Sequence, residues 1–87
     1  MNYYLYILQS LTNDRFYVGH TNNLERRLKE HNSGQTKSTK PHIPWELVFS
    51  KTYYNKSDTN RAELFIKKKK SKIYIHNLIC NKTKLPF

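Results

Sequence analysis

Residues 3–21, YYLYILQSLTNDRFYVGHT, contain two strand-forming runs separated by a short turn. The first run, residues 3–10, is rich in aromatic and β-branched side chains and is too short to favour a helix. Residues 11–14 supply the asparagine and aspartate that are typical of turns. Residues 16–21 then continue as a returning strand, so the stretch predicts an antiparallel hairpin.

The length of the turn predicts how the two strands pair. If residues 11–14 form the loop, Tyr6 lies opposite Gly19 and Tyr17 lies opposite Leu8. Directly opposed residues share a face of the sheet, and so do alternate residues of one strand. Both tyrosines are therefore expected to project from one face, with Gly19 leaving open space beside Tyr6. A shift of one residue would separate the two rings.

The middle of the chain predicts a helix, a loop and a third strand. Asn22 is a suitable N-cap, Glu25 is its capping-box partner, and Gly34 is a natural end for this helix. Residues 33–44 contain turn formers, lysines and two prolines, so we expect an exposed loop. Residues 45–54 (WELVFSKTYY) are typical of a strand.

Two more helices are expected in the last third. Ser57 and Asp58 begin the first of them, and Ser71 begins the second after the lysine run. The predicted order is β-β-α-β-α-α, an α+β fold in which a small antiparallel sheet packs against three helices. We see neither a repeat nor a linker, so residues 1–87 are expected to form a single domain.

The chain is small and strongly basic. Its 87 residues include 16 Lys and Arg against six Asp and Glu, a net charge of +10. Such an excess can simply keep a small protein soluble, but the clustering of lysines at residues 67–70 favours a nucleic-acid partner. An anionic membrane is the rival partner, yet the lysine run lacks a wide apolar face, and no apolar run approaches roughly 20 residues.

Several other site types are disfavoured by composition. The single cysteine, Cys80, excludes an internal disulfide and fits a reducing cytoplasm. Four histidines and one cysteine show no zinc-ligand spacing, and two glycines are too few for a glycine-rich phosphate loop. No small-molecule cofactor is expected.

Four residues have the chemistry to hydrolyse a phosphodiester. Tyr6 and Tyr17 fit ordinary strand aromatics, and either acts as a base only where cations stabilise a phenolate, since its reference pKa is about 10. Arg27 is either a solvated helix residue or a bidentate clamp on a phosphate. His31, four residues later, is either a surface residue or a group that orients water or shares a proton.

Glu63 is the acidic residue best placed to bind a metal ion. It lies beside the apolar stripe of its helix, whereas Glu30, for example, is expected to face solvent. One carboxylate suffices for Mg²⁺, which completes its octahedron with waters and substrate phosphate. An ion pair between Glu63 and Lys67 at i+4 explains the spacing equally well.

Together these motifs resemble the GIY-YIG nuclease superfamily, in particular its small stand-alone bacterial members that are similar to the catalytic domain of UvrC. The resemblance runs through YLYIL at residues 4–8, YVGHTN at 17–22, LERRLKEHNSG at 24–34, PWELV at 44–48, AE at 62–63 and IK at 66–67. Tyr4 stands where the family's first motif has glycine, and Leu5 where it has isoleucine.

The resemblance implies a three-stranded antiparallel sheet flanked by helices and metal-dependent hydrolysis of a nucleic-acid phosphodiester. By position, it implies catalytic roles for Tyr6, Tyr17, Arg27 and His31, a structural role for Gly19, and Glu63 as the ligand of one Mg²⁺ or Mn²⁺ ion. Which tyrosine accepts the proton is left open. DNA is the expected partner, with RNA an open alternative.

Basic side chains outside this set are expected to contact phosphates: Arg26, Lys37, Lys40, Lys67, Lys68, Lys69 and Lys70. The alternative function is a module with the same fold that binds nucleic acid without cutting it. The sequence predicts no oligomeric state.

Overall fold

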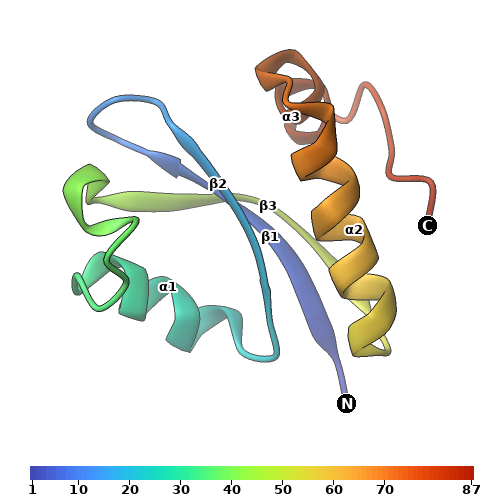
Figure 1. Cartoon of the computed structure of the whole chain (residues 1–87), viewed down its shortest axis with the longest axis horizontal. Coiled ribbons are helices and arrows are strands. Elements are labelled where there is room, and N and C mark those ends of the chain that lie inside the picture. Colours follow the sequence, from blue (N-terminus) through green and yellow to red (C-terminus); the bar gives the residue numbers. More distant parts are fainter.

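The computed structural model describes residues 1–87, and a three-stranded antiparallel sheet lies at its centre (Figure 1). Strand β1 (Tyr3–Ser10) pairs with β2 (Phe16–Thr21) on one side and with β3 (Trp45–Tyr53) on the other. The helices are α1 (Leu24–Asn32), a 3₁₀ turn (Lys40–His42), α2 (Lys56–Lys69) and α3 (Lys72–Ile79). The predicted α+β fold and the order β-β-α-β-α-α are confirmed.

The register of the β1–β2 hairpin is also confirmed. The Ser10 amide donates to the Arg15 carbonyl at 2.8 Å, which closes the four-residue loop. Tyr6 lies opposite Gly19, and Leu8 lies opposite Tyr17. Because β2 is an edge strand, the side of the hairpin at Gly19 has no neighbouring strand.

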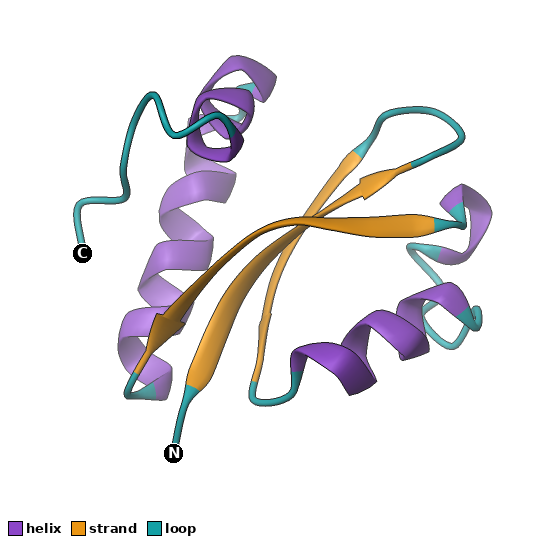
Figure 2. Ribbon diagram, turned by 180° about the vertical axis from the view of Figure 1, so that it is seen from behind, coloured by secondary structure: helices purple, strands orange, loops and turns teal.

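The two faces of the sheet are covered by different helices, as Figure 2 shows from behind. Alternate residues of β1 point to opposite faces, so each face buries its own cluster. On the α2 side the buried cluster includes Leu5, Ile7, Val18, Ala62 and Ile66. On the α1 side it consists of Tyr6, Leu8 and Trp45, with Tyr17, Leu24, Leu28 and Ile43 packed against it. The tyrosines therefore belong to the α1 face.

Two helices begin one residue away from their predicted starts: α1 begins later and α2 begins earlier. The N-cap of α1 is Asn23, whose side chain accepts from the Arg26 amide at 3.0 Å. Asn22, the predicted cap, instead accepts from the Arg26 guanidinium at 3.3 Å, and Glu25 has no capping role. Two adjacent asparagines are equivalent caps by propensity, and the extended backbone of Asn23 selects the second.

Helix α2 begins at Lys56 with Asn55 as its N-cap, one residue before the predicted Ser57. It ends where Lys70 adopts a left-handed conformation, and Ser71 caps α3 as predicted. No helix has the length and apolar surface that are needed to cross a membrane.

The segment at residues 33–44 differs from the expected exposed loop at one position. Most of its side chains are exposed or half-buried, but Thr39 is 1% exposed. The Trp45 indole donates to the Thr39 carbonyl at 2.9 Å, which holds this segment against the α1 face.

Candidate active site

Tyr6 is the centre of the candidate site. It extends from β1, is 2% exposed, and places its ring over Gly19 of the neighbouring strand. A Cβ atom at residue 19 would lie 2.7 Å from the Tyr6 hydroxyl oxygen and 2.8 Å from the ring carbon that bears it. Only glycine fits there without displacing the phenol, so Gly19 determines where the hydroxyl lies.

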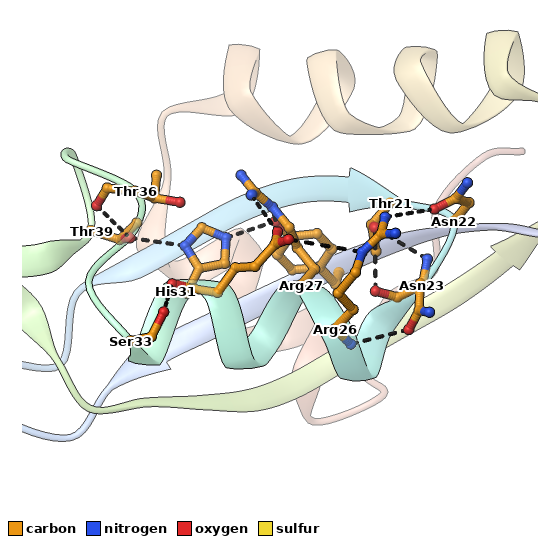
Figure 3. Close-up of polar contacts among 11 residues, drawn as sticks. Thr21, Asn22, Asn23, Arg26, Arg27, His31, Ser33, Thr36 and Thr39 are labelled. Atoms are coloured by element: carbon orange, nitrogen blue, oxygen red, sulfur yellow. Dashed lines mark hydrogen bonds and ion pairs between the residues drawn. The ribbon is translucent and has the colours of Figure 1, made fainter.

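The Tyr6 hydroxyl lies between two side chains of α1, Arg27 and His31. Figure 3 shows these two side chains with the polar contacts around them. The oxygen is 3.0 Å from His31 Nε2, and it accepts from Arg27 Nε at 3.4 Å. Arg27 and His31 are four residues apart, so one helix face presents both to the same atom. Arg27 Nη1 also donates to Glu30 Oε1 at 3.0 Å.

Tyr17 completes the group on this face. Its ring centroid is 6.2 Å from that of Tyr6 and 4.8 Å from that of His31. The Tyr17 hydroxyl has no hydrogen-bond partner in the chain, and no buried side-chain N or O atom lacks a partner. The hydroxyl is thus open to solvent, where a water or a phosphate oxygen can reach it.

The surroundings of Tyr6, His31 and Arg27 shift the pKa of each side chain. Burial raises the pKa of Tyr6 to about 12, against the opposing effect of its hydrogen bond to Arg27. Burial and the Arg27 charge lower the pKa of His31 to about 4. Burial disfavours the charge of Arg27, but the hydrogen bonds to Tyr6 and Glu30 outweigh it and raise its pKa. At neutral pH the face therefore presents a phenol, a neutral imidazole and a guanidinium cation.

Glu63 is not among these contacts. It lies on α2, which covers the opposite face, and its Oε1 is 2.7 Å from His20 Nδ1 while its Oε2 is 2.7 Å from Lys67 Nζ. The ion pair with Lys67 that the spacing allowed is present. The Glu63 charge still adds to the rise in the Tyr6 pKa, so the carboxylate lies within electrostatic range of the phenol across the edge strand.

The residues around Glu63 fit one kind of metal site. No group of three or more His, Cys, Asp or Glu side chains could hold a metal ion. A single half-buried carboxylate with spare lone pairs suits Mg²⁺ or Mn²⁺, which bind through one or two carboxylates and several waters. A cation there would compete with Lys67 for the carboxylate.

The predicted phosphate-contacting residues occupy two regions. Lys37 and Lys40 are exposed on the segment that carries Thr39, and Arg26 is 61% exposed beside Glu30 on α1. The lysine run at residues 67–70 closes α2, and its members differ in their contacts. Lys67 pairs with Glu63, Lys69 lies 4.8 Å from the ring centroid of Phe65, and Lys68 and Lys70 form no ion pair.

Three residues of the site are not identified by the sequence. Glu30 was expected to face solvent, but its carboxylate is 3.0 Å from Arg27 and 3.8 Å from Arg26. Its i+3 and i+4 spacing from these arginines is the signal that could have found it. His20 and Thr39 contact Glu63 and His31 through the tertiary fold, and no local pattern marks either.

Comparisons with known proteins identify the family of the chain. Residues 2–77 match the family model described as the GIY-YIG catalytic domain. The chain belongs to this family. It is 37% identical over 78 residues to UPF0213 protein YazA of Bacillus subtilis, covering 85% of this chain and 78% of that protein. It is 41% identical over 66 residues to UPF0213 protein CPE1444 of Clostridium perfringens, covering 75% and 70%.

A solved structure shares the fold. The solution NMR structure of UPF0213 protein BH0048 from Bacillus halodurans superposes with a TM-score of 0.59 at 32% identity, covering 94% of this chain and 86% of that chain. The names of these relatives specify neither reaction nor substrate. Membership of the GIY-YIG family implies a nuclease-type activity on nucleic acid, in a family whose nucleases generally depend on a divalent metal.

Proposed function

We propose that residues 1–87 act as one GIY-YIG unit that hydrolyses phosphodiester bonds within nucleic acid, with DNA as the substrate and a single Mg²⁺ or Mn²⁺ ion as cofactor. The observation that supports this proposal most strongly is the Tyr6 hydroxyl between Arg27 Nε and His31 Nε2. A phenol held by a fixed cation on one side and a neutral imidazole on the other can exchange protons. Simple binding of phosphate does not require such an arrangement.

The proton path follows from the hydrogen bonds. Tyr6 takes a proton from the attacking water while its own proton passes to His31 Nε2, 3.0 Å away. Because the two proton transfers are coupled, no free phenolate forms at Tyr6, whose high pKa disfavours the phenolate. The open hydroxyl of Tyr17 orients the water or a phosphate oxygen in this proposal. Tyr6 is therefore the base in preference to Tyr17.

Arg27 has two roles in the proposal. Its remaining N–H groups face a phosphate and neutralise the charge that develops on it. Its charge also lowers the pKa of His31 in the absence of substrate. A phosphate anion bound to Arg27 offsets that charge, so substrate binding makes His31 a better proton acceptor when it is needed.

Glu63 would hold the divalent cation. The ion would supply positive charge beside the leaving 3′ oxygen. Gly19 separates Tyr6 on one face of the edge strand from Glu63 on the other. The proposed position of the scissile phosphate is therefore at this edge, where both faces are within reach.

The second candidate function is a module that binds nucleic acid without cutting it. One observation favours it: both oxygens of Glu63 already have partners, His20 and Lys67, and neither contacts the tyrosine face. If the contacts of Glu63 with His20 and Lys67 are purely structural, the basic surface would still bind phosphates and the chain would lack a metal ligand.

Cleavage assays separate the two candidates. The full chain is incubated with duplex, single-stranded, flapped and branched DNA and the corresponding RNA, in Mg²⁺, in Mn²⁺ and in EDTA. Glu63→Gln is compared with Glu46→Gln, which removes an exposed carboxylate from β3. The nuclease proposal predicts metal-dependent cutting by the wild type and Glu46→Gln, and none by Glu63→Gln.

Two results would count against the nuclease proposal. If the wild type binds the substrates and cuts none in either metal, the binding module is correct. If Glu63→Gln unfolds, Glu63 is a structural ion-pair partner and its assignment as metal ligand fails.

A further inference from the structure

Thr39 has a polar environment that its sequence context does not predict. It lies among turn formers and lysines, yet it is 1% exposed and its hydroxyl contacts the ring of His31, which is fully buried. The distance from Thr39 Oγ1 to His31 Nδ1 is 2.8 Å, and that from Thr39 Oγ1 to the Thr36 carbonyl oxygen is 3.2 Å (Figure 3). The nitrogen that faces Thr39 is the one that does not face Tyr6.

One protonation state of His31 lets the Thr39 hydroxyl use both contacts as hydrogen bonds. A carbonyl oxygen only accepts, so the Thr39 hydroxyl makes both contacts as hydrogen bonds only when its single hydrogen is donated to Thr36. In that arrangement the Thr39 oxygen accepts from His31, and Nδ1 is the protonated nitrogen. In a neutral imidazole the other nitrogen, Nε2, is left as the acceptor.

The consequence reaches the Tyr6 hydroxyl. With Nε2 as an acceptor, the Tyr6 hydroxyl donates to His31 and simultaneously accepts from Arg27 Nε. In the other tautomer, Nε2–H would point at the Tyr6 oxygen and His31 could not take a proton from it. The direction of the whole chain of hydrogen bonds therefore depends on Thr39.

We propose that Thr39 is a positioning residue that fixes His31 as the Nδ1–H tautomer and so makes Nε2 the proton acceptor for Tyr6. The catalytic part of this inference rests on the proposed nuclease function, whereas the tautomer itself does not. The backbone of Thr39 is suited to this role, since its amide donates to the Thr36 carbonyl and its carbonyl accepts from the Trp45 indole at 2.9 Å.

The test combines a spectroscopic signature with kinetics on the full chain. ¹⁵N NMR of histidine-labelled protein distinguishes Nδ1–H from Nε2–H, and His31→Gln identifies the His31 signals among the four histidines. The variants are Thr39→Val, which removes the hydroxyl at nearly constant shape, and Thr39→Ser, which keeps it. Thr36→Val is the matched control, because Thr36 contributes only its main-chain carbonyl.

The wild type, Thr39→Ser and Thr36→Val should show the Nδ1–H tautomer, and Thr39→Val should lose it. Cleavage by Thr39→Val should fall on the order of a hundredfold, while Thr39→Ser stays close to the wild-type rate. An Nε2–H tautomer in the wild type would overturn the inference at once. So would a Thr39→Val variant that loses the tautomer but cuts at the wild-type rate.

The measurements also separate this inference from the proposed function. If the wild type shows the Nδ1–H tautomer but cuts no substrate, the nuclease proposal fails while the positioning of His31 by Thr39 stands. If Thr39→Val unfolds, the wild-type tautomer and the Thr39→Ser rate still decide the inference, since both need only folded protein.

Discussion

Replacing Gly19 by alanine should separate catalysis from stability. The new methyl carbon would lie 2.7 Å from the Tyr6 hydroxyl oxygen and 3.2 Å from a ring carbon of Tyr17. To restore an ordinary contact of 3.4 Å, the Tyr6 hydroxyl would have to move by about 0.7 Å. Its hydrogen bond from Arg27 is already 3.4 Å long, so it has little room to lengthen.

The expected magnitudes differ for the two properties. Overpacking costs about 1–3 kcal/mol, and replacing glycine by alanine inside a strand returns about 0.5–1 kcal/mol, so the free energy of unfolding should fall by no more than about 2.5 kcal/mol. A displacement approaching 1 Å at a reacting group can slow a reaction about a hundredfold. The variant should thus stay folded and lose nearly all cleavage.

Gly34 is the only other glycine in the chain, so Gly34→Ala is the control. Gly34 has φ of +82°, which alanine adopts only with strain, while its nearest side-chain atoms are 3.5 Å from the added carbon. This variant should lose stability by about 1 kcal/mol and keep its cleavage rate. Urea unfolding and single-turnover cleavage measure the two properties. Wild-type cleavage by Gly19→Ala would refute the placement of the chemistry at Tyr6.

Three further predictions concern the cations and His31. Arg27→Ala should still bind DNA, and its cleavage rate should fall on the order of a hundredfold or more. Single-turnover cleavage and a binding titration measure the two properties, and an unchanged rate would remove Arg27 from the mechanism. Replacing all four lysines of residues 67–70 by glutamine should weaken binding to every DNA sequence alike. It should also lower the magnitude of the slope of log affinity against log salt by about 3 to 4. An unchanged slope would show that these lysines only solvate α2. The pKa of His31 is lowered to about 4 in the folded chain, by burial and the Arg27 charge, from about 6.5 when unfolded. The unfolded chain then binds more protons between these values, so the free energy of unfolding should rise from pH 4 to pH 6.5 by up to about 3 kcal/mol. Urea titrations across this range should show that rise in the wild type and a flatter profile in His31→Gln; equal profiles would contradict the placement of His31.

The hairpin could be predicted from the sequence because its determinants are local. A four-residue turn and the alternation of strand side chains are enough to place Tyr6 opposite Gly19. The same reasoning joins Arg27 to His31, since i and i+4 share a helix face. The predicted start of α1 is less accurate, because two adjacent asparagines, Asn22 and Asn23, can each serve as its N-cap.

The rest of the site depends on contacts between distant segments. Thr39 lies in a polar segment whose composition predicts exposure, and only the packing of Trp45 and His31 around it accounts for its burial. The contact between His20 and Glu63 joins residues that are 43 positions apart. Neither contact leaves a local pattern, so the partners of His31 and Glu63 needed the structure.

The central claim is that the Tyr6 hydroxyl is the group that takes the proton from water, and Tyr6→Phe tests it most directly. Phenylalanine keeps the ring that packs on the α1 face and removes only the oxygen between Arg27 and His31. The measurement is the single-turnover cleavage rate in Mg²⁺, beside DNA affinity in EDTA. The account predicts near-normal affinity and a rate lower by about 10²–10⁴-fold. A folded Tyr6→Phe variant that cuts DNA at close to the wild-type rate would contradict it.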